Sequence, residues 1–129
     1  MSYADPVTLV RSAVTRATGL PTTRVLDVTF TAGPMPVVHV HHLGGTSGDI
    51  DRTDAVGIDV YHHTPAGPAD ASAASVATTV RDALAGTGLD TGTGLIDEVD
   101  VTSEPVVRPY YEDVEVAAMV LDVTHRPTH

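Results

Sequence analysis

The sequence VVHVHHL at residues 37–43, followed by AVGIDVYHH at residues 55–63, decides the fold, because apolar and polar side chains alternate along both stretches. In the first stretch His39 and His41 share one face, and the valines beside them share the other. An alternation with a period of two is typical of a β-strand that is buried on one side. The sequence therefore predicts two half-buried strands joined by a long polar loop at residues 44–54.

Two amphipathic helices are predicted outside these strands. The first covers about residues 6–18, where Asp5 is a favourable cap and Pro6 suits the first helical position. The second covers about residues 71–85 and begins after Asp70, which we expect to cap it. Its apolar face consists largely of alanine, so this helix can lie close against a sheet.

Further stretches rich in β-branched and aliphatic residues lie at residues 24–31, 95–102 and 114–124. The middle of the last one, Val116–Leu121, is apolar on both faces and needs a cover on both sides. We expect residues 103–113 to form a polar connection. The sequence thus predicts an α+β fold, with a four- or five-stranded, largely antiparallel sheet and two helices packed on one face, in the order α-(β)-β-β-α-β-β.

The composition excludes several classes of protein. Acidic residues outnumber basic ones by 17 to 7, and the formal net charge of -10 argues against a binder of nucleic-acid backbones. The absence of cysteine excludes disulfides and thiolate zinc sites. No stretch approaches the roughly 20 apolar residues of a membrane span, and the first residues do not resemble a signal peptide. We therefore expect no membrane insertion and no Sec targeting.

The histidines are the first candidates for metal ligands. If the two strands pair, His39 comes near Ile58 and diagonally near Asp59, and with His41 these side chains offer ligands for a metal ion. A solvent-exposed polar strand face is the favoured interpretation, and we predict neither a metal nor another cofactor. Ser47 lies in a glycine-rich loop rather than in the strand–turn–helix elbow of a hydrolase. We therefore predict no catalytic residues.

Two polar connections are the candidates for contacts with other protein chains. Long loops on a rigid sheet commonly carry binding, and tyrosine and arginine are favoured at protein interfaces. The candidate interface residues are Gly44, Gly45, Asp49, Asp51, Asp54, Arg108, Tyr110, Tyr111, Glu112 and Asp113.

The order and lengths of these segments resemble those of a known family. The segments that carry the likeness are the Pro36–Gly45 strand and its Gly-Gly turn, the strand 55–61, the alanine-rich helix with Arg81 near its end, and the closing residues 123–127. Together they resemble the tail terminator (tail-completion) proteins of long-tailed bacteriophages, especially those of actinobacterial hosts. The likeness covers roughly residues 5–127, so we treat residues 1–129 as a single tail-terminator-like domain.

This resemblance implies a structural role without chemistry. Members of the family form a hexameric ring that terminates tail-tube polymerisation and joins the tail to the head-completion (neck) proteins. The implied partners are further copies of the chain, the tail tube protein and a neck protein, while genomic DNA passes through the channel without specific binding. The implied location is the head–tail junction of the virion, and the host cytoplasm during assembly.

Three alternatives stay open from the sequence. The first is another head–tail connector or neck subunit, because such proteins have similar small α+β folds. The second is a metal-binding module built on His39, His41 and Asp59. The third is a small dimeric domain of ferredoxin-like layout with a ligand pocket at the edge of the sheet.

Overall fold

The computed structural model describes residues 4–47, 52–91 and 94–126. The elements in chain order are α1 (Pro6–Thr18), β1 (Thr22–Thr23), the 3-10 helix η1 (Phe30–Ala32), β2 (Val37–Ser47), β3 (Arg52–His63), α2 (Ala73–Leu84), β4 (Gly86–Asp90), β5 (Leu95–Tyr111) and β6 (Val114–His125). Within these residues no helix is both long enough and apolar enough to cross a bilayer.

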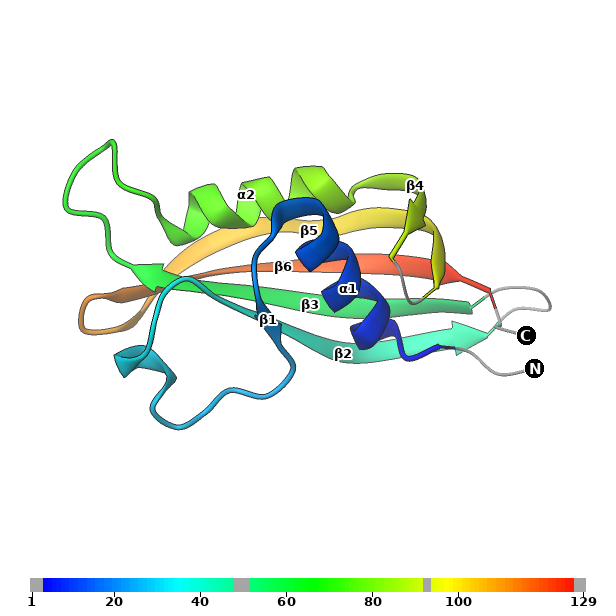
Figure 1. Cartoon of the computed structure of the whole chain (residues 1–129), viewed down its shortest axis with the longest axis horizontal. Helices are drawn as coiled ribbons and strands as arrows, with labels where there is room; N and C mark the ends of the chain where they lie inside the picture. Colours follow the sequence, from blue (N-terminus) through cyan, green and yellow to red (C-terminus); the bar gives the residue numbers. More distant parts are fainter. Residues whose placement is uncertain (1–3, 48–51, 92–93, 127–129) are drawn as a thin grey trace.

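One mixed sheet organises the molecule. In the part of the chain that the structure describes, its six strands lie in the order β1-β2-β3-β6-β5-β4. β1 runs parallel to β2, and every other pair is antiparallel. Both α-helices lie on the same face of the sheet (Figure 1). This confirms the predicted α+β class with two helices on one face, although the sheet has more strands than expected.

The main core lies between the two helices and the sheet. Its largest fully buried side chains include Leu9, Val10, Val14, Val38, Val40, Val56, Ile58, Leu84, Ile96, Met119 and Leu121. The fully buried Ala73 and Ala77 bring α2 close to the sheet, as the alanine-rich pattern predicts.

Local signals explain where the helices begin and end. Asp5 caps α1 by accepting a hydrogen bond from the Val7 N–H at 3.0 Å, and Gly19 ends α1 at a φ of 75°. The prediction that Asp70 caps the second helix is wrong, because Ser72 caps α2 in a capping box with Ser75.

The prediction of a strand at residues 24–31 is wrong, because these residues form turns and the start of η1. Of the described residues before η1, only Thr22–Thr23, which precede the predicted strand, pair with β2, and the chain then turns. The Asp27 carboxylate accepts a hydrogen bond from the Thr29 N–H at 3.1 Å, and such a local bond competes with strand pairing.

The two connections predicted from the sequence belong largely to β-strands in the structure. The expected loop at residues 44–54 is largely strand, because β2 continues to Ser47 and β3 begins at Arg52. The expected connection at residues 103–113 is also strand up to Tyr111. Its prolines are tolerated because β5 beyond Val99 has no strand on its outer side in the described residues and its register shifts there.

Residues 86–90 pair as β4 with the start of β5. Gly86 and Gly88 adopt φ values of 128° and 71°, and these left-handed conformations let the chain turn back directly after α2.

A second, smaller cluster covers one end of the opposite sheet face. Tyr61, Val114 and Val116 are buried there beneath the segment 24–36, which contributes Phe30 among others. The ring of Tyr61 lies 4.8 Å from that of Phe30 and 4.9 Å from that of Tyr110, in edge-on geometry. This cluster covers the second face of β6 at Val114 and Val116, whereas Ala118 and Val120 on the same face stay half-buried.

Candidate functional site

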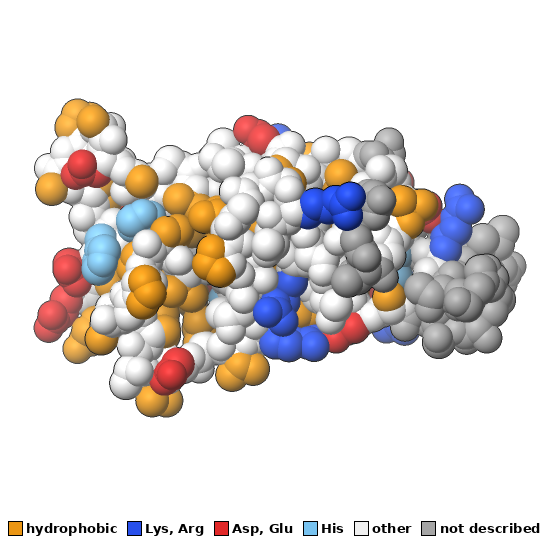
Figure 2. Space-filling model, viewed as in Figure 1, with side chains coloured by type: hydrophobic (Ala, Val, Ile, Leu, Met, Phe, Trp, Pro, Cys, Tyr) orange, Lys and Arg blue, Asp and Glu red, His pale blue; other side chains and the backbone are white. Residues whose placement is uncertain are grey.

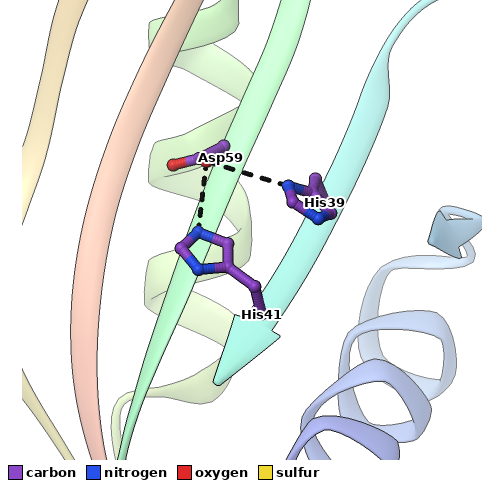
Figure 3. Close-up of side chains that lie close together, drawn as sticks. All are labelled: His39, His41 and Asp59. Atoms are coloured by element: carbon purple, nitrogen blue, oxygen red, sulfur yellow. Dashed lines mark hydrogen bonds and ion pairs between the residues drawn. The ribbon is translucent and has the colours of Figure 1, made fainter. Parts of the chain in front are cut away.

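His39, His41 and Asp59 form a cluster on the sheet face opposite the helices. His39 and His41 alternate with the buried valines of β2, and Asp59 lies on β3. The strand register places His39 directly opposite Asp59, one residue away from the partner expected from the sequence. The three side chains point toward one another (Figure 3).

The distances in this cluster are short. The Asp59 Oδ2 atom lies 3.1 Å from His41 Nε2 and 3.8 Å from His39 Nδ1. The two imidazole rings are stacked with their centroids 4.9 Å apart. The side chains are half-buried, with exposed fractions between 17% for His39 and 31% for His41. The cluster is thus ordered by the sheet yet reachable from solvent.

Gly57 makes room for the His41 ring. It is the cross-strand partner of His41, and a Cβ atom built on Gly57 would lie 2.6 Å from His41 Nε2. Any larger residue at position 57 would force the ring to leave its present position beside Asp59. The glycine in the middle of β3 therefore has a specific role in the cluster.

The hydrogen bonding of His39 fixes its neutral tautomer. His39 Nε2 lies 3.1 Å from the carbonyl oxygen of Arg24, which can only accept, so Nε2 carries the proton. The buried Nδ1 atom then presents a lone pair, and no hydrogen-bond partner for it exists among the described residues. Its nearest charged neighbour is the Asp59 carboxylate, itself an acceptor.

A second polar cluster is buried on the helix-covered side of the sheet. The side chains of Asp54 and His125 are fully buried, and Asp54 Oδ2 lies 2.7 Å from His125 Nε2. The other oxygen, Asp54 Oδ1, lies 2.7 Å from His42 Nε2, and Arg52 Nε contacts both oxygens at 3.0 and 3.2 Å. Burial raises the pKa of Asp54, but the hydrogen bonds from His125, His42 and Arg52 outweigh burial and leave that pKa below its ordinary value.

Sequence reasoning missed the role of Asp54, although a signal was present. Asp54 precedes Val56, Ile58 and Val60 at the same two-residue interval, so it lies on the core-facing side of β3. Its position opposite Gly45 also matters, since a Cβ atom on that glycine would lie 2.9 Å from Asp54 Cγ.

The candidate interface residues fall into separate groups at opposite ends of the sheet (Figure 1). Arg108, Tyr110 and Tyr111 lie at the end of β5, followed by the Glu112–Asp113 turn. Gly44, Gly45 and Asp54 lie at the other end, and the buried Asp54 side chain is not available to a partner. Asp49 and Asp51 lie outside the described residues.

The distal half of β5 is an exposed, apolar strand edge. β4 pairs only with Leu95–Val99, so the outer side of β5 from residue 100 onward has no partner strand in the described chain. Val106, Val107 and Tyr111 are 62%, 41% and 57% exposed. Figure 2 shows the face that carries α1 and the segment 24–36, where hydrophobic side chains gather toward the end of the sheet with the β5–β6 turn. Unpaired apolar edges are typical interaction surfaces.

A groove of about 490 Å³ lies between residues 21–36 and the start of β2. Phe30, Met35 and Val37 contribute to its largely apolar lining. This groove lies at the β1–β2 edge of the sheet. The alternative of a small dimeric ligand-binding domain predicts a pocket at a sheet edge.

Comparison with known proteins gives a match of fold rather than of sequence. No protein-family model matches the sequence, and no curated protein matches it significantly. The structure is similar to that of a chain in the virion of a native gene transfer agent (GTA) particle, with a TM-score of 0.55 and 18% sequence identity. The match covers 95% of this chain and 87% of that chain. At this identity the likeness shows a shared fold.

Proposed function

We propose that the chain is a structural component of a phage-like virion and acts there without enzymatic activity. The observation that carries this proposal is the fold match with the GTA virion chain, because the match spans 95% of this chain and 87% of that chain. Residues 1–129 then act as a single domain.

Within such a virion, the finer proposal is a tail terminator. Copies of the chain form a hexameric ring at the head–tail junction, stop polymerisation of the tail tube, and connect the tail to a neck protein. This finer assignment rests on the sequence resemblance to tail terminators over residues 5–127 and agrees with the fold match.

The sheet offers two different edges for a ring. A closed ring needs two unlike surfaces that contact each other head to tail. One is the exposed edge of β5, with Val106, Val107 and Tyr111. The other is β2 beyond its short pairing with β1, on the opposite side of the sheet order. The exposed candidate residues Arg108, Tyr110, Glu112 and Asp113 would flank the first of these surfaces.

The charge of the chain suits a DNA channel. With a net charge of -10 per subunit, a ring would repel the phosphate backbone and let DNA pass without adhesion.

The decisive experiment is deletion of the gene in the particle-producing host, followed by electron microscopy. A terminator predicts tail tubes of uncontrolled length that are not joined to heads. Tails of normal length beside unjoined heads would indicate a neck subunit instead. Normal particles, or a purified dimer with a ligand in the 490 Å³ groove, would overturn the virion assignment.

A further inference from the structure

We propose that His39 Nδ1, His41 Nε2 and Asp59 Oδ2 bind a divalent transition metal ion, with Zn²⁺ as the best-fitting ion. These ligand atoms all lie within 4.8 Å of one another on two adjacent strands (Figure 3). The site is independent of the ring proposal, because every ligand comes from one chain.

The two distances from the Asp59 carboxylate to the histidine nitrogens are close to those between ligands of a tetrahedral ion. Two ligands that each lie about 2.0–2.1 Å from a tetrahedral ion are roughly 3.3 Å apart. The distances from Asp59 Oδ2, 3.1 Å to His41 Nε2 and 3.8 Å to His39 Nδ1, bracket this value. The two imidazole nitrogens lie within 4.8 Å of each other, and side-chain rotation has to bring them closer before all three donors surround one ion.

The hydrogen bond from His39 Nε2 to the Arg24 carbonyl is the strongest single argument. A metal-bound histidine usually donates its other ring N–H to a carbonyl or carboxylate, which orients the ring. His39 already has this arrangement, and its buried Nδ1 lone pair faces the Asp59 carboxylate with no donor between them. A cation in that position removes the repulsion between two acceptors.

His41 contributes the second nitrogen by a change of protonation. In the metal-free protein its Nε2–H donates to Asp59 Oδ2 at 3.1 Å. When the ion binds, the Nε2 position loses its proton to solvent or to Nδ1, and the Nε2 lone pair coordinates the metal. Because Gly57 has no side chain, it leaves the space that the His41 ring occupies beside Asp59.

The donor set determines the class of ion. Two imidazole nitrogens and one carboxylate oxygen suit Zn²⁺, Co²⁺, Ni²⁺ or Cu²⁺, whereas Ca²⁺ and Mg²⁺ prefer oxygen ligands throughout. Three protein ligands leave a fourth position for water, and the half-buried side chains leave access for it.

The test is metal binding to the untagged full-length chain, since a histidine tag would itself bind zinc. After removal of metal by chelation and dialysis, isothermal titration with Zn²⁺ should give about one ion per chain. Co²⁺ in its place should give the strong visible absorption of a tetrahedral complex. His39→Gln, His41→Gln and Asp59→Asn should each weaken Zn²⁺ binding by roughly 10- to 100-fold or more.

The matched controls are His62→Gln and His63→Gln, because these adjacent histidines lie outside the cluster and contact each other instead. They should bind Zn²⁺ like the wild type. Circular dichroism and thermal unfolding establish that each variant is folded, and at one Zn²⁺ concentration the Tm of the wild type should rise more than that of Asp59→Asn. Binding far below one ion per chain, or equal loss in the control variants, would overturn the proposal.

Discussion

The Asp54 carboxylate and the His125 imidazole lie 2.7 Å apart, and both side chains are completely buried. They connect the beginning of β3 to the end of β6, diagonally across the antiparallel pair in which Asp54 lies opposite Val123. A buried carboxylate costs free energy unless it is paired and hydrogen-bonded. Here hydrogen bonds from His125, His42 and Arg52 offset the cost of burying the Asp54 carboxylate. The cluster therefore ties β3 to β6 and to β2 at this end of the sheet.

Replacing Asp54 by asparagine should destabilise the protein strongly. The change leaves the buried His125 and the Arg52 guanidinium without their carboxylate, and breaking a buried pair on one side typically costs about 3–5 kcal/mol. The measurement is the free energy of unfolding in urea. As a control, Asp82→Asn on the exposed surface of α2 should change it by less than about 0.5 kcal/mol. A loss below about 1 kcal/mol in Asp54→Asn would contradict the structural role.

The stability of the protein should fall at acidic pH because of the same carboxylate. The pKa of Asp54 is lowered in the folded state, although burial alone raises it. A lowered pKa contributes stability that is fully present above the unfolded value of about 3.9 and is lost as the pH falls through the folded value. Urea midpoints measured from pH 6 to pH 3 should therefore decrease more steeply in the wild type than in Asp54→Asn. Parallel profiles for the two proteins would exclude this source of the pH dependence.

Alternation along β2 and β3 is enough to predict both strands and to place His39, His41 and Asp59 on one face. The register between the strands cannot be read in the same way, because it depends on the turn and on the irregularity between His42 and Gly44. A one-residue difference decides whether His39 lies opposite Ile58 or Asp59, and hence whether a metal site can form.

Contacts between side chains far apart in the sequence could not be predicted either. Asp54 and His125 are 71 residues apart, and only the pairing of β3 with β6 brings them together. The extension of β5 through Pro105 and Pro109 could not be predicted from the sequence either, because prolines normally argue against a strand. They are tolerated here on an edge, and that position follows from the tertiary structure alone.

Replacing Gly57 by alanine should weaken Zn²⁺ binding while leaving the fold intact. The φ of Gly57 is not positive, so alanine is tolerated by the backbone, but its Cβ would displace the His41 ring from Asp59. We expect binding to weaken roughly tenfold or more, as measured by isothermal titration. Gly67→Ala is the matched control, because a Cβ there meets nothing within 4 Å. Unchanged zinc affinity in Gly57→Ala would argue against His41 as a ligand.

Charged substitutions on the exposed edge of β5 should prevent ring formation without unfolding the subunit. Val106 is 62% exposed in the single chain, so Val106→Lys should change the free energy of unfolding by less than about 0.5 kcal/mol. If this edge contacts a neighbouring subunit, the buried lysine destabilises the interface, and light scattering should show a shift from the ring to single subunits. Val28→Lys is the matched control, because Val28 is an equally apolar side chain that is 98% exposed and does not belong to β5. A ring of undiminished mass in Val106→Lys would remove the β5 edge from the proposed interface, whereas loss of the ring in both variants would point to a general effect of added charge.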